Sequence, residues 1–311
     1  MYFLAKFLAR LIKSGGLTVI AANGEEYVFG GEQSGPEVTI KLHDPALAWK
    51  LFLKPELASG EAYMDGTLTI ERGTLREFFD LITGNMGWQP DNPLNAKNAR
   101  VRRFRNFLSQ YDNSLRAAKS VAHHYDLSNE LFSRFLDEGM HYSCAYFSDQ
   151  NPERDLEKAQ LEKAEHITTK LLLEPGHSVL DIGCGWGAMA LHLRDRMDVD
   201  VTGVTLSKQQ FELARERATD RGVAEHVRIL FQDYRDIVGT FDRIVSVGMF
   251  EHVGLPHHRK FFEVVRDRLK PDGVALLHTI GRADGPGITD DWTAKYIFPR
   301  GYVPSLSEIM K

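Results

Sequence analysis

Short apolar runs alternate with amphipathic stretches between about residue 171 and residue 280. The intervening stretches repeat apolar residues at helical spacing, most clearly at residues 208–221 and 258–269. The apolar runs predict strands at residues 178–181, 199–205, 227–231, 241–247 and 273–280. This rhythm predicts an α/β fold, in which a doubly wound, mostly parallel sheet carries helices on both faces.

The N-terminal region has a different pattern, typical of a small α+β domain. Residues 17–22 and 27–29 flank Asn23-Gly24, a dipeptide that suits the positive φ of a tight turn, so we expect a hairpin there. A further strand is predicted at residues 38–42, and helices at residues 46–53 and 75–82.

Domain boundaries follow from where these patterns stop. We expect an N-terminal domain at residues 1–83, a linker at 84–113 and the α/β domain at 114–311. The linker is rich in Gly, Asn and Pro and then in basic residues. Its basic stretch is interpreted as a solvated charged face, with a patch for anionic phospholipid headgroups as the alternative.

The first residues predict an amphipathic helix. Charges at Lys6 and Arg10 interrupt the apolar stretch, which argues against a signal peptide. The apolar positions at helical spacing are Leu4, Phe7, Leu8, Leu11 and Ile12. We expect this helix to dock on its own domain, and the alternative is a helix that lies on a membrane surface.

Composition narrows the partners. Hydrophobic residues make up 43% of the chain and the net charge is −5, so we expect a packed core and no nucleic-acid partner. No apolar run reaches the roughly 20 residues that span a bilayer, so we expect no transmembrane segment. Cys144 and Cys184 lie far apart, outside any paired or zinc-binding spacing, which favours free thiols in the cytoplasm.

Metal binding is not expected. The pairs His123-His124 and His257-His258 suggest a metal only superficially, because adjacent histidines point apart. A third ligand at zinc spacing is also missing from both pairs.

A glycine-rich loop lies where the first predicted strand of the α/β domain ends and a helix begins. Residues 179–187 read Val-Leu-Asp-Ile-Gly-Cys-Gly-Trp-Gly. Glycines let backbone N–H groups approach a ligand closely, and the helix N-terminus adds positive potential. A dinucleotide site would want an acidic residue about 20 positions later, but residues 205–210 hold no carboxylate. The Asp-x-Gly-x-Gly-x-Gly form instead resembles the first motif of class I methyltransferases. The resemblance implies that the glycines, Gly183, Gly185 and Gly187, face the methionine part of S-adenosylmethionine. Asp181 and Cys184 are counted with them as cofactor-binding positions, although a small buried filler is the preferred role of Cys184.

The end of the third strand, Gln232-Asp233-Tyr234, is where that fold holds the adenine. Asp233 can accept a hydrogen bond from the adenine amino group, and Tyr234 can lie beside the ring.

Further stretches sharpen the resemblance. They are residues 123–130, 140–147, 205–210, 247–254, 276–280 and 296–299. From about residue 120 onward, the chain closely resembles the cyclopropane-fatty-acyl-phospholipid synthases and mycolic acid cyclopropane synthases. Such enzymes move the methyl of S-adenosylmethionine to a cis double bond of an acyl chain, and a proton is then lost to bound bicarbonate as the ring closes.

The resemblance also implies site residues. The bicarbonate cage corresponds to Cys144, Glu251, His278 and the backbone at Ile280, and further cofactor contacts to Tyr142, Ser143, Thr205, Leu206 and Gln210. Each cage residue has a structural alternative: Cys144 as a small buried residue, Glu251 as a helix cap and His278 as a core histidine.

The implied partners are unsaturated phospholipids at the inner face of the membrane, with peripheral association of a cytoplasmic protein; a homodimer stays open. Methyl branching of an acyl chain, N-methylation of another substrate, and an inactive lipid- or cofactor-binding protein are the alternative functions.

The chain departs from the family pattern at its C-terminal end. About 30 residues follow the fifth strand, and the antiparallel strand pair that completes a seven-stranded methyltransferase sheet does not fit in residues 281–311. We therefore expect a sheet that is incomplete at the C-terminus, with an unpaired edge.

Overall fold

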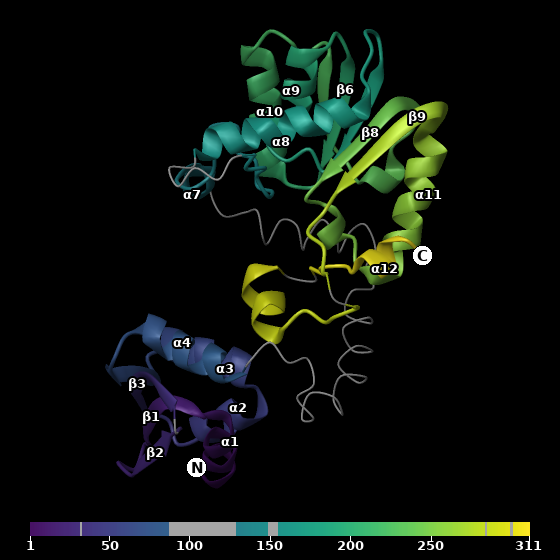
Figure 1. The fold of residues 1–311 in the computed structure, drawn as a ribbon. Helices are drawn as coiled ribbons and strands as arrows, with labels where there is room; N and C mark the ends of the chain where they lie inside the picture. Colours follow the sequence, from purple (N-terminus) through teal and green to yellow (C-terminus); the bar gives the residue numbers. More distant parts are fainter. Residues whose placement is uncertain (32, 87–128, 149–154, 284, 299–300) are drawn as a thin grey trace. The chain divides into compact units, whose positions relative to one another are not determined.

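The computed structural model describes residues 1–31, 33–86, 129–148, 155–283, 285–298 and 301–311. The chain forms two compact units, one of residues 1–100 with 290–296 and the other of residues 101–289 with 297–311 (Figure 1). Most of the expected linker, with its basic stretch, and the pair His123-His124 lie outside the described residues. No helix in the described ranges is both long and apolar enough to cross a membrane.

The N-terminal unit is built on a sheet with the strand order β2-β1-β3-β4. Its strands are β1 (Ser14–Ile20), β2 (Glu26–Gly30), β3 (Gln33–Leu42) and β4 (Leu68–Arg72). The predicted hairpin is confirmed: β1 and β2 pair antiparallel, and Gly24 has φ +85° in the turn between them. β3 then pairs parallel to β1.

Four described helices accompany this sheet. They are α1 (Tyr2–Leu11), α2 (Leu47–Leu53), α3 (Pro55–Met64) and α4 (Leu75–Met86). Leu4 and Leu8 of α1 are buried in the same apolar core as Leu17 of β1. The prediction that the first helix docks on its own domain is therefore confirmed.

The second unit contains a parallel sheet with the strand order β7-β6-β5-β8-β9. Its strands are β5 (Ser178–Ile182), β6 (Asp200–Thr205), β7 (Val227–Phe231), β8 (Phe241–Val247) and β9 (Leu269–His278). This order matches the predicted doubly wound fold. The chain winds one way from β5 to β7 and the other way through β8 and β9, so the carboxyl ends of β5 and β8 flank the point at which such folds bind ligands.

Helices cover both faces of this sheet. The helices that pack on it are α8 (Leu156–Leu171), α9 (Ala188–Arg196), α10 (Lys208–Asp220) and α11 (His258–Arg268). The described part of the unit also contains the short helices α7 (Asn129–Ser133) and α12 (Leu306–Ile309). Val179 of β5 joins the core beneath α8, α9 and α10, whereas Leu180 and Ile182 join the core beneath α11. Burial on both faces explains why the strands are continuous apolar runs.

Candidate active site

The glycine loop after β5 has the geometry of a ligand cradle. Gly183, Gly185 and Gly187 have φ of +80°, +55° and +82°, a region that favours glycine. The N–H groups of Gly183 and Cys184 both donate to the carbonyl of Val204, which fixes the loop against β6. A Cβ on Gly183 would meet the Met249 side chain at 2.5 Å, but one on Gly185 would meet nothing within 4 Å. Open space at Gly185 is what close approach of a ligand requires.

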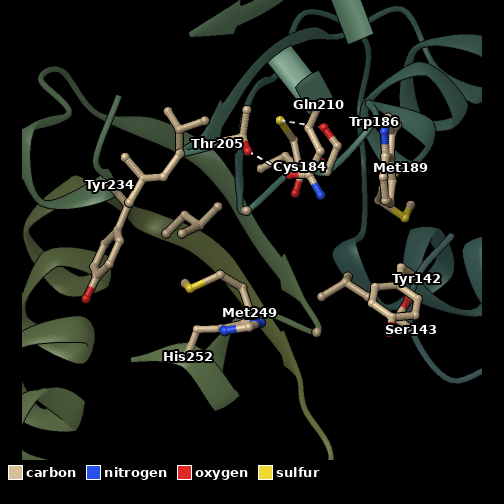
Figure 2. Close-up of a pocket in the computed structure, with 18 of the residues that line it drawn as sticks. Tyr142, Ser143, Cys184, Trp186, Met189, Thr205, Gln210, Tyr234, Met249 and His252 are labelled. Atoms are coloured by element: carbon tan, nitrogen blue, oxygen red, sulfur yellow. Dashed lines mark hydrogen bonds between the residues drawn. The ribbon is translucent and has the colours of Figure 1, made fainter. Parts of the chain in front are cut away.

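A pocket opens beside this loop (Figure 2). The predicted cofactor contacts that line it are Tyr142, Ser143, Asp181, Gly183, Cys184, Gly185, Thr205, Leu206, Gln210, Asp233 and Tyr234. Gly187 does not line the pocket and is the N-cap of α9. We call this space the donor pocket. The structure thus brings together predicted residues from the ends of three strands, β5, β6 and β7, and from the segment before α8.

Behind the pocket, the end of β6 is held by a buried hydrogen-bond network. The Thr205 hydroxyl and the Gln210 side-chain carbonyl are 2.9 Å apart, and the Ser207 hydroxyl accepts from the Gln210 N–H at 3.3 Å. All three residues are buried. This network caps α10 and fixes the Gln210 side chain at the pocket wall (Figure 2).

The end of β7 carries a feature that the sequence did not predict. Arg235 donates to both carboxylate oxygens of Asp233, at 2.9 and 2.7 Å. An adenine amino group would therefore be an additional donor to an already paired carboxylate. Burial raises the pKa of the neighbouring Tyr234, whose ring lies 5.6 Å from that of Phe261. The adenine-binding roles of Asp233 and Tyr234 stay predictions.

Asp181, the last acidic residue before the glycines, is 1% exposed. Its Oδ2 atom has no hydrogen-bond partner within the described ranges. Burial raises the pKa of this carboxyl to about 7. A buried carboxylate that lacks a partner and lines the donor pocket fits a cationic ligand, and S-adenosylmethionine carries both a sulfonium and an ammonium group.

Because the pKa of Asp181 is raised by folding, its contribution to stability should fall as pH rises from about 4 to about 7. We expect Asp181→Asn to raise the free energy of unfolding at pH 8 by about 2 to 4 kcal/mol, with little change near pH 4. Its affinity for S-adenosylmethionine at pH 8 should fall about 10-fold. Urea unfolding at both pH values and calorimetry with the donor check this, with exposed Asp220→Asn as control. Equal stability gains at both pH values would contradict it.

The predicted anion cage lies at the ends of β8 and β9. Glu251 is 2% exposed, and its Oε1 atom accepts the N–H of Ile280 at 2.5 Å. The Glu251 Oε2 and His278 Nδ1 atoms have no hydrogen-bond partner in the part of the chain that the structure describes. Burial lowers the pKa of His278, the positive charge of Lys163 lowers it further and Glu251 opposes both, which favours a neutral imidazole at pH 7.

A second pocket adjoins this end of the sheet. Cys144 and His278 line it together with Lys163, and the rest of its wall holds mainly apolar residues such as Phe262 and Leu276 but also the polar residues His166, Lys170, Thr279 and Arg282. We call it the apolar pocket. Cys144 is exposed, in contrast to the alternative of a buried core residue, and Cys184 is a buried free thiol. The described residues contain no group of three His, Cys, Asp or Glu that could hold a metal.

Sequence reasoning missed several groups at the site. Met249 and His252, just after β8, line the donor pocket (Figure 2). Lys163 lines both pockets. A signal for Lys163 was available, because residues 160, 163, 164, 167 and 171 follow helical spacing and form the buried stripe of α8. Two polar residues, Gln160 and Lys163, lie on that stripe.

The sequence matches the family described as mycolic acid cyclopropane synthetase over residues 112–311, and a domain of unknown function over residues 3–87. It is 44% identical over 271 residues to the cyclopropane-fatty-acyl-phospholipid synthase of Escherichia coli K12, an alignment that covers 87% of this chain and 68% of that protein. It is 38% identical over 203 residues to cyclopropane mycolic acid synthase 3 of Mycobacterium tuberculosis, covering 61% of this chain and 70% of the relative.

Solved structures agree with this relationship. The cyclopropane synthase MmaA2 from Mycobacterium tuberculosis is 36% identical with a TM-score of 0.57, over 62% of this chain and 72% of that one. The mycolic acid cyclopropane synthase CmaA1, solved with S-adenosylhomocysteine, is 35% identical with a TM-score of 0.56 over the same shares. The chain therefore belongs to the mycolic acid cyclopropane synthetase family of S-adenosylmethionine-dependent methyltransferases, with the class I methyltransferase fold.

Proposed function

We propose that this chain transfers the methyl group of S-adenosylmethionine to the cis double bond of an unsaturated phospholipid acyl chain and closes a cyclopropane ring. One observation carries the proposal. The donor pocket at the end of β5 lies next to Glu251, just after β8, and His278, at the end of β9, and each has a buried polar atom that finds no hydrogen-bond partner among the described residues. The Escherichia coli relative, named for cyclopropanation of fatty acyl phospholipids, supports the choice of substrate.

The proposed reaction sets clear demands on the protein. The alkene electron pair bonds to the methyl carbon as the carbon–sulfur bond breaks, which releases S-adenosylhomocysteine and leaves a carbocation on the acyl chain. A base then takes one methyl proton, and the electron pair of that C–H bond closes the ring. An alkene is a weak nucleophile, so the site must hold the reactants close and exclude water. The buried wall of the donor pocket, with Trp186 at 2% exposure, suits that task.

We further propose that Cys144, Glu251, His278 and the backbone at Ile280 hold a bicarbonate ion. Bicarbonate would supply a base that takes the proton. The fit rests on the two unpaired buried atoms: a carboxylate oxygen of Glu251 can accept the O–H of the anion, and a neutral His278 can donate to it. The N–H of Ile280 donates to Glu251 and orients that carboxylate.

Methyl branching is the second candidate, because two relatives are named as methyltransferases of fatty acids and not as cyclopropane synthases. The tuberculostearic acid methyltransferase UfaA1 of Mycobacterium tuberculosis is 33% identical over 289 residues, which is 86% of this chain and 64% of that protein. A probable fatty acid methyltransferase of Pseudomonas putida is 34% identical over 284 residues. Both candidates use the same donor pocket and differ in the fate of the methyl proton.

A turnover assay on vesicles of unsaturated phospholipid tests the proposal. We expect acyl chains heavier by one CH₂ that resist mild hydrogenation of alkenes. A methylated alkene would take up hydrogen, and would favour the second candidate. Binding of S-adenosylmethionine without any product would favour an inactive binding protein.

We also propose that the N-terminal domain, residues 1–83, holds the enzyme at the inner face of the membrane as a peripheral protein, with the linker at 84–113 leading to the catalytic domain at 114–311. The support is an exposed aromatic cluster on α1 and α2. The Phe3 ring lies 5.8 Å from that of Trp49, and both residues are more than half exposed. Lys6 lies over the ring of Tyr2. Aromatic rings suit the membrane interface, and lysines attract anionic headgroups.

Replacing both Phe3 and Trp49 with Ser should weaken binding to anionic phospholipid vesicles about 10-fold, because less apolar area enters the interface. Co-sedimentation with vesicles measures this. Phe79→Ser is the matched control, since Phe79 is a similarly exposed aromatic on α4 of the same unit. Equal losses in the control, or none in the double variant, would contradict a role for the cluster.

A further inference from the structure

Lys163 of α8 is a buried cation that forms no ion pair with a carboxylate of the described residues, although the charge of Asp137 raises its pKa. Its side chain is 3% exposed, and its ammonium donates to the Ser143 hydroxyl at 2.9 Å and to the Gln160 side-chain carbonyl at 2.6 Å. Both contacts are neutral groups. Burial lowers the pKa of Lys163 to about 8. Because a buried charge is costly unless it is compensated, a cation kept in this position calls for an explanation.

The contacts of Lys163 tie a short segment to α8. Gln160, one turn earlier on the helix, donates its amide to the carbonyls of His141 and Ser143 at 3.2 and 3.1 Å. Lys163 holds the Ser143 hydroxyl from the same side. The two side chains together therefore hold residues 141–143 against the helix.

This segment separates the two pockets. Tyr142 and Ser143 line the donor pocket, and the next residue, Cys144, lines the apolar pocket. Lys163 itself lines both. Any shift of the segment would move a donor contact and a cage residue together.

The charge of Lys163 also reaches the proposed cage. It contributes to the lowered pKa of His278, and Cys144 and Asp137 in turn raise the pKa of Lys163. A positive charge near an otherwise unpaired Glu251 oxygen and a neutral imidazole favours a small anion there.

We propose that Lys163 is a positioning residue for methyl transfer: its ammonium fixes the segment between the two pockets, and its charge holds the anion beside His278 and Cys144. This inference rests on the proposed function of the cage. Helix α8 thereby contributes to catalysis in addition to the glycine loop and the strand ends.

Kinetics of Lys163→Met and Lys163→Arg test the proposal, with Lys158→Met as control because Lys158 is exposed on the same helix. We expect Lys163→Met to raise the bicarbonate concentration at half-maximal rate about 10- to 100-fold, with a smaller change in the KM for S-adenosylmethionine. Lys163→Arg should restore most of the bicarbonate affinity. Unchanged bicarbonate dependence in Lys163→Met, or an Arg variant no better than the Met variant despite normal thermal unfolding, would overturn it.

The pH profile gives a second readout. In the wild type, the bicarbonate requirement should rise as pH passes through about 8 and Lys163 loses its proton. In Lys163→Arg the bicarbonate requirement should not rise over this pH range, because a guanidinium group does not lose its proton there. The other titratable and charged groups around the cation and in the apolar pocket stay the same in the variant; they are Asp137, His141, Cys144, His166, Lys170, Asp181, His278 and Arg282. If the bicarbonate requirement of Lys163→Arg still rises over this pH range, one of these other groups causes the rise, and the result counts against Lys163.

A measurement that does not depend on turnover tests the role of Lys163 independently of the proposed function. We expect bicarbonate to protect Cys144 from alkylation by iodoacetamide, and Lys163→Met to need about 10-fold more bicarbonate than the wild type for half-maximal protection, since the variant lacks the cation that holds the anion beside Cys144. Peptide mass spectrometry distinguishes Cys144 from the buried Cys184. An unchanged bicarbonate dependence of the protection in Lys163→Met would refute the placement of the charge. A wild type that makes no cyclopropane would refute only the proposed function.

Discussion

Replacing Glu251 or His278 with Gln should lower turnover about 100- to 1,000-fold and leave the affinity for S-adenosylmethionine within about threefold. Glu251 Oε2 and His278 Nδ1 are the buried cage atoms without a hydrogen-bond partner in the described part of the chain, and neither residue lines the donor pocket. Each substitution therefore removes a group that holds the proton acceptor while the donor contacts stay in place.

Initial rates on phospholipid vesicles and calorimetry with the donor separate these two effects. The wild type should also slow down in buffer stripped of bicarbonate, and Glu251→Gln should lose most of that dependence. Glu263→Gln, on the partly exposed α11, is the control. Full turnover in either cage variant would place the proton acceptor elsewhere.

The second large effect is expected at Gly185. A Cβ on this residue would point into open space beside the glycine loop, where the donor is expected to lie. Gly185→Ala should therefore weaken binding of S-adenosylmethionine roughly 10- to 100-fold. The positive φ of +55° adds a conformational cost of about 1 kcal/mol to folding.

Gly176→Ala is the matched control, because Gly176 also has a positive φ, of +83°, and open space around it, but lies before β5 and away from the pocket. Both variants should lose a similar amount of stability in thermal unfolding, and only Gly185→Ala should lose donor affinity in calorimetry. Equal donor affinity in the two variants would mean that the loop does not contact the donor.

The sequence predicted the α/β unit well because strands buried on both faces leave continuous apolar runs. The predictions for β7 and β8 match the structure residue for residue. The start of β9 was predicted at residue 273, four residues late, because Lys270, Pro271 and Asp272 are polar or turn-forming and exposed. Pairing with β8 extends the strand through them across a register shift.

Helix α3 of the N-terminal unit was not predicted, because its apolar pattern is weak. Helix α3 begins at Pro55 and includes Ser59 and Gly60, and only Ala58 and Ala62 are buried along it. Such a helix has too weak an apolar stripe to be recognised from periodicity, and packing in the unit decides its structure.

The site residues that the sequence predicted were those that belong to a local pattern. The glycine loop was predicted because its spacing is local, and the strand-end residues because the carboxyl ends of parallel strands meet at one edge of the sheet. The contact of Lys163 with Ser143 joins residues 20 positions apart in the chain, and no local pattern specifies it. Arg235 and Asp233 are only two positions apart in the sequence, but whether they pair depends on the side-chain rotamers that packing at the site allows.

A methyl donor labelled with deuterium tests the central claim most directly. The wild-type chain, given S-adenosylmethionine with a CD₃ group and vesicles of unsaturated phospholipid, should yield acyl chains that keep two of the three deuterium atoms in a ring carbon, since one leaves with the proton acceptor. Acyl chains that keep all three would show methyl branching instead, and acyl chains with no deuterium would show that the chain does not transfer the methyl group to lipid.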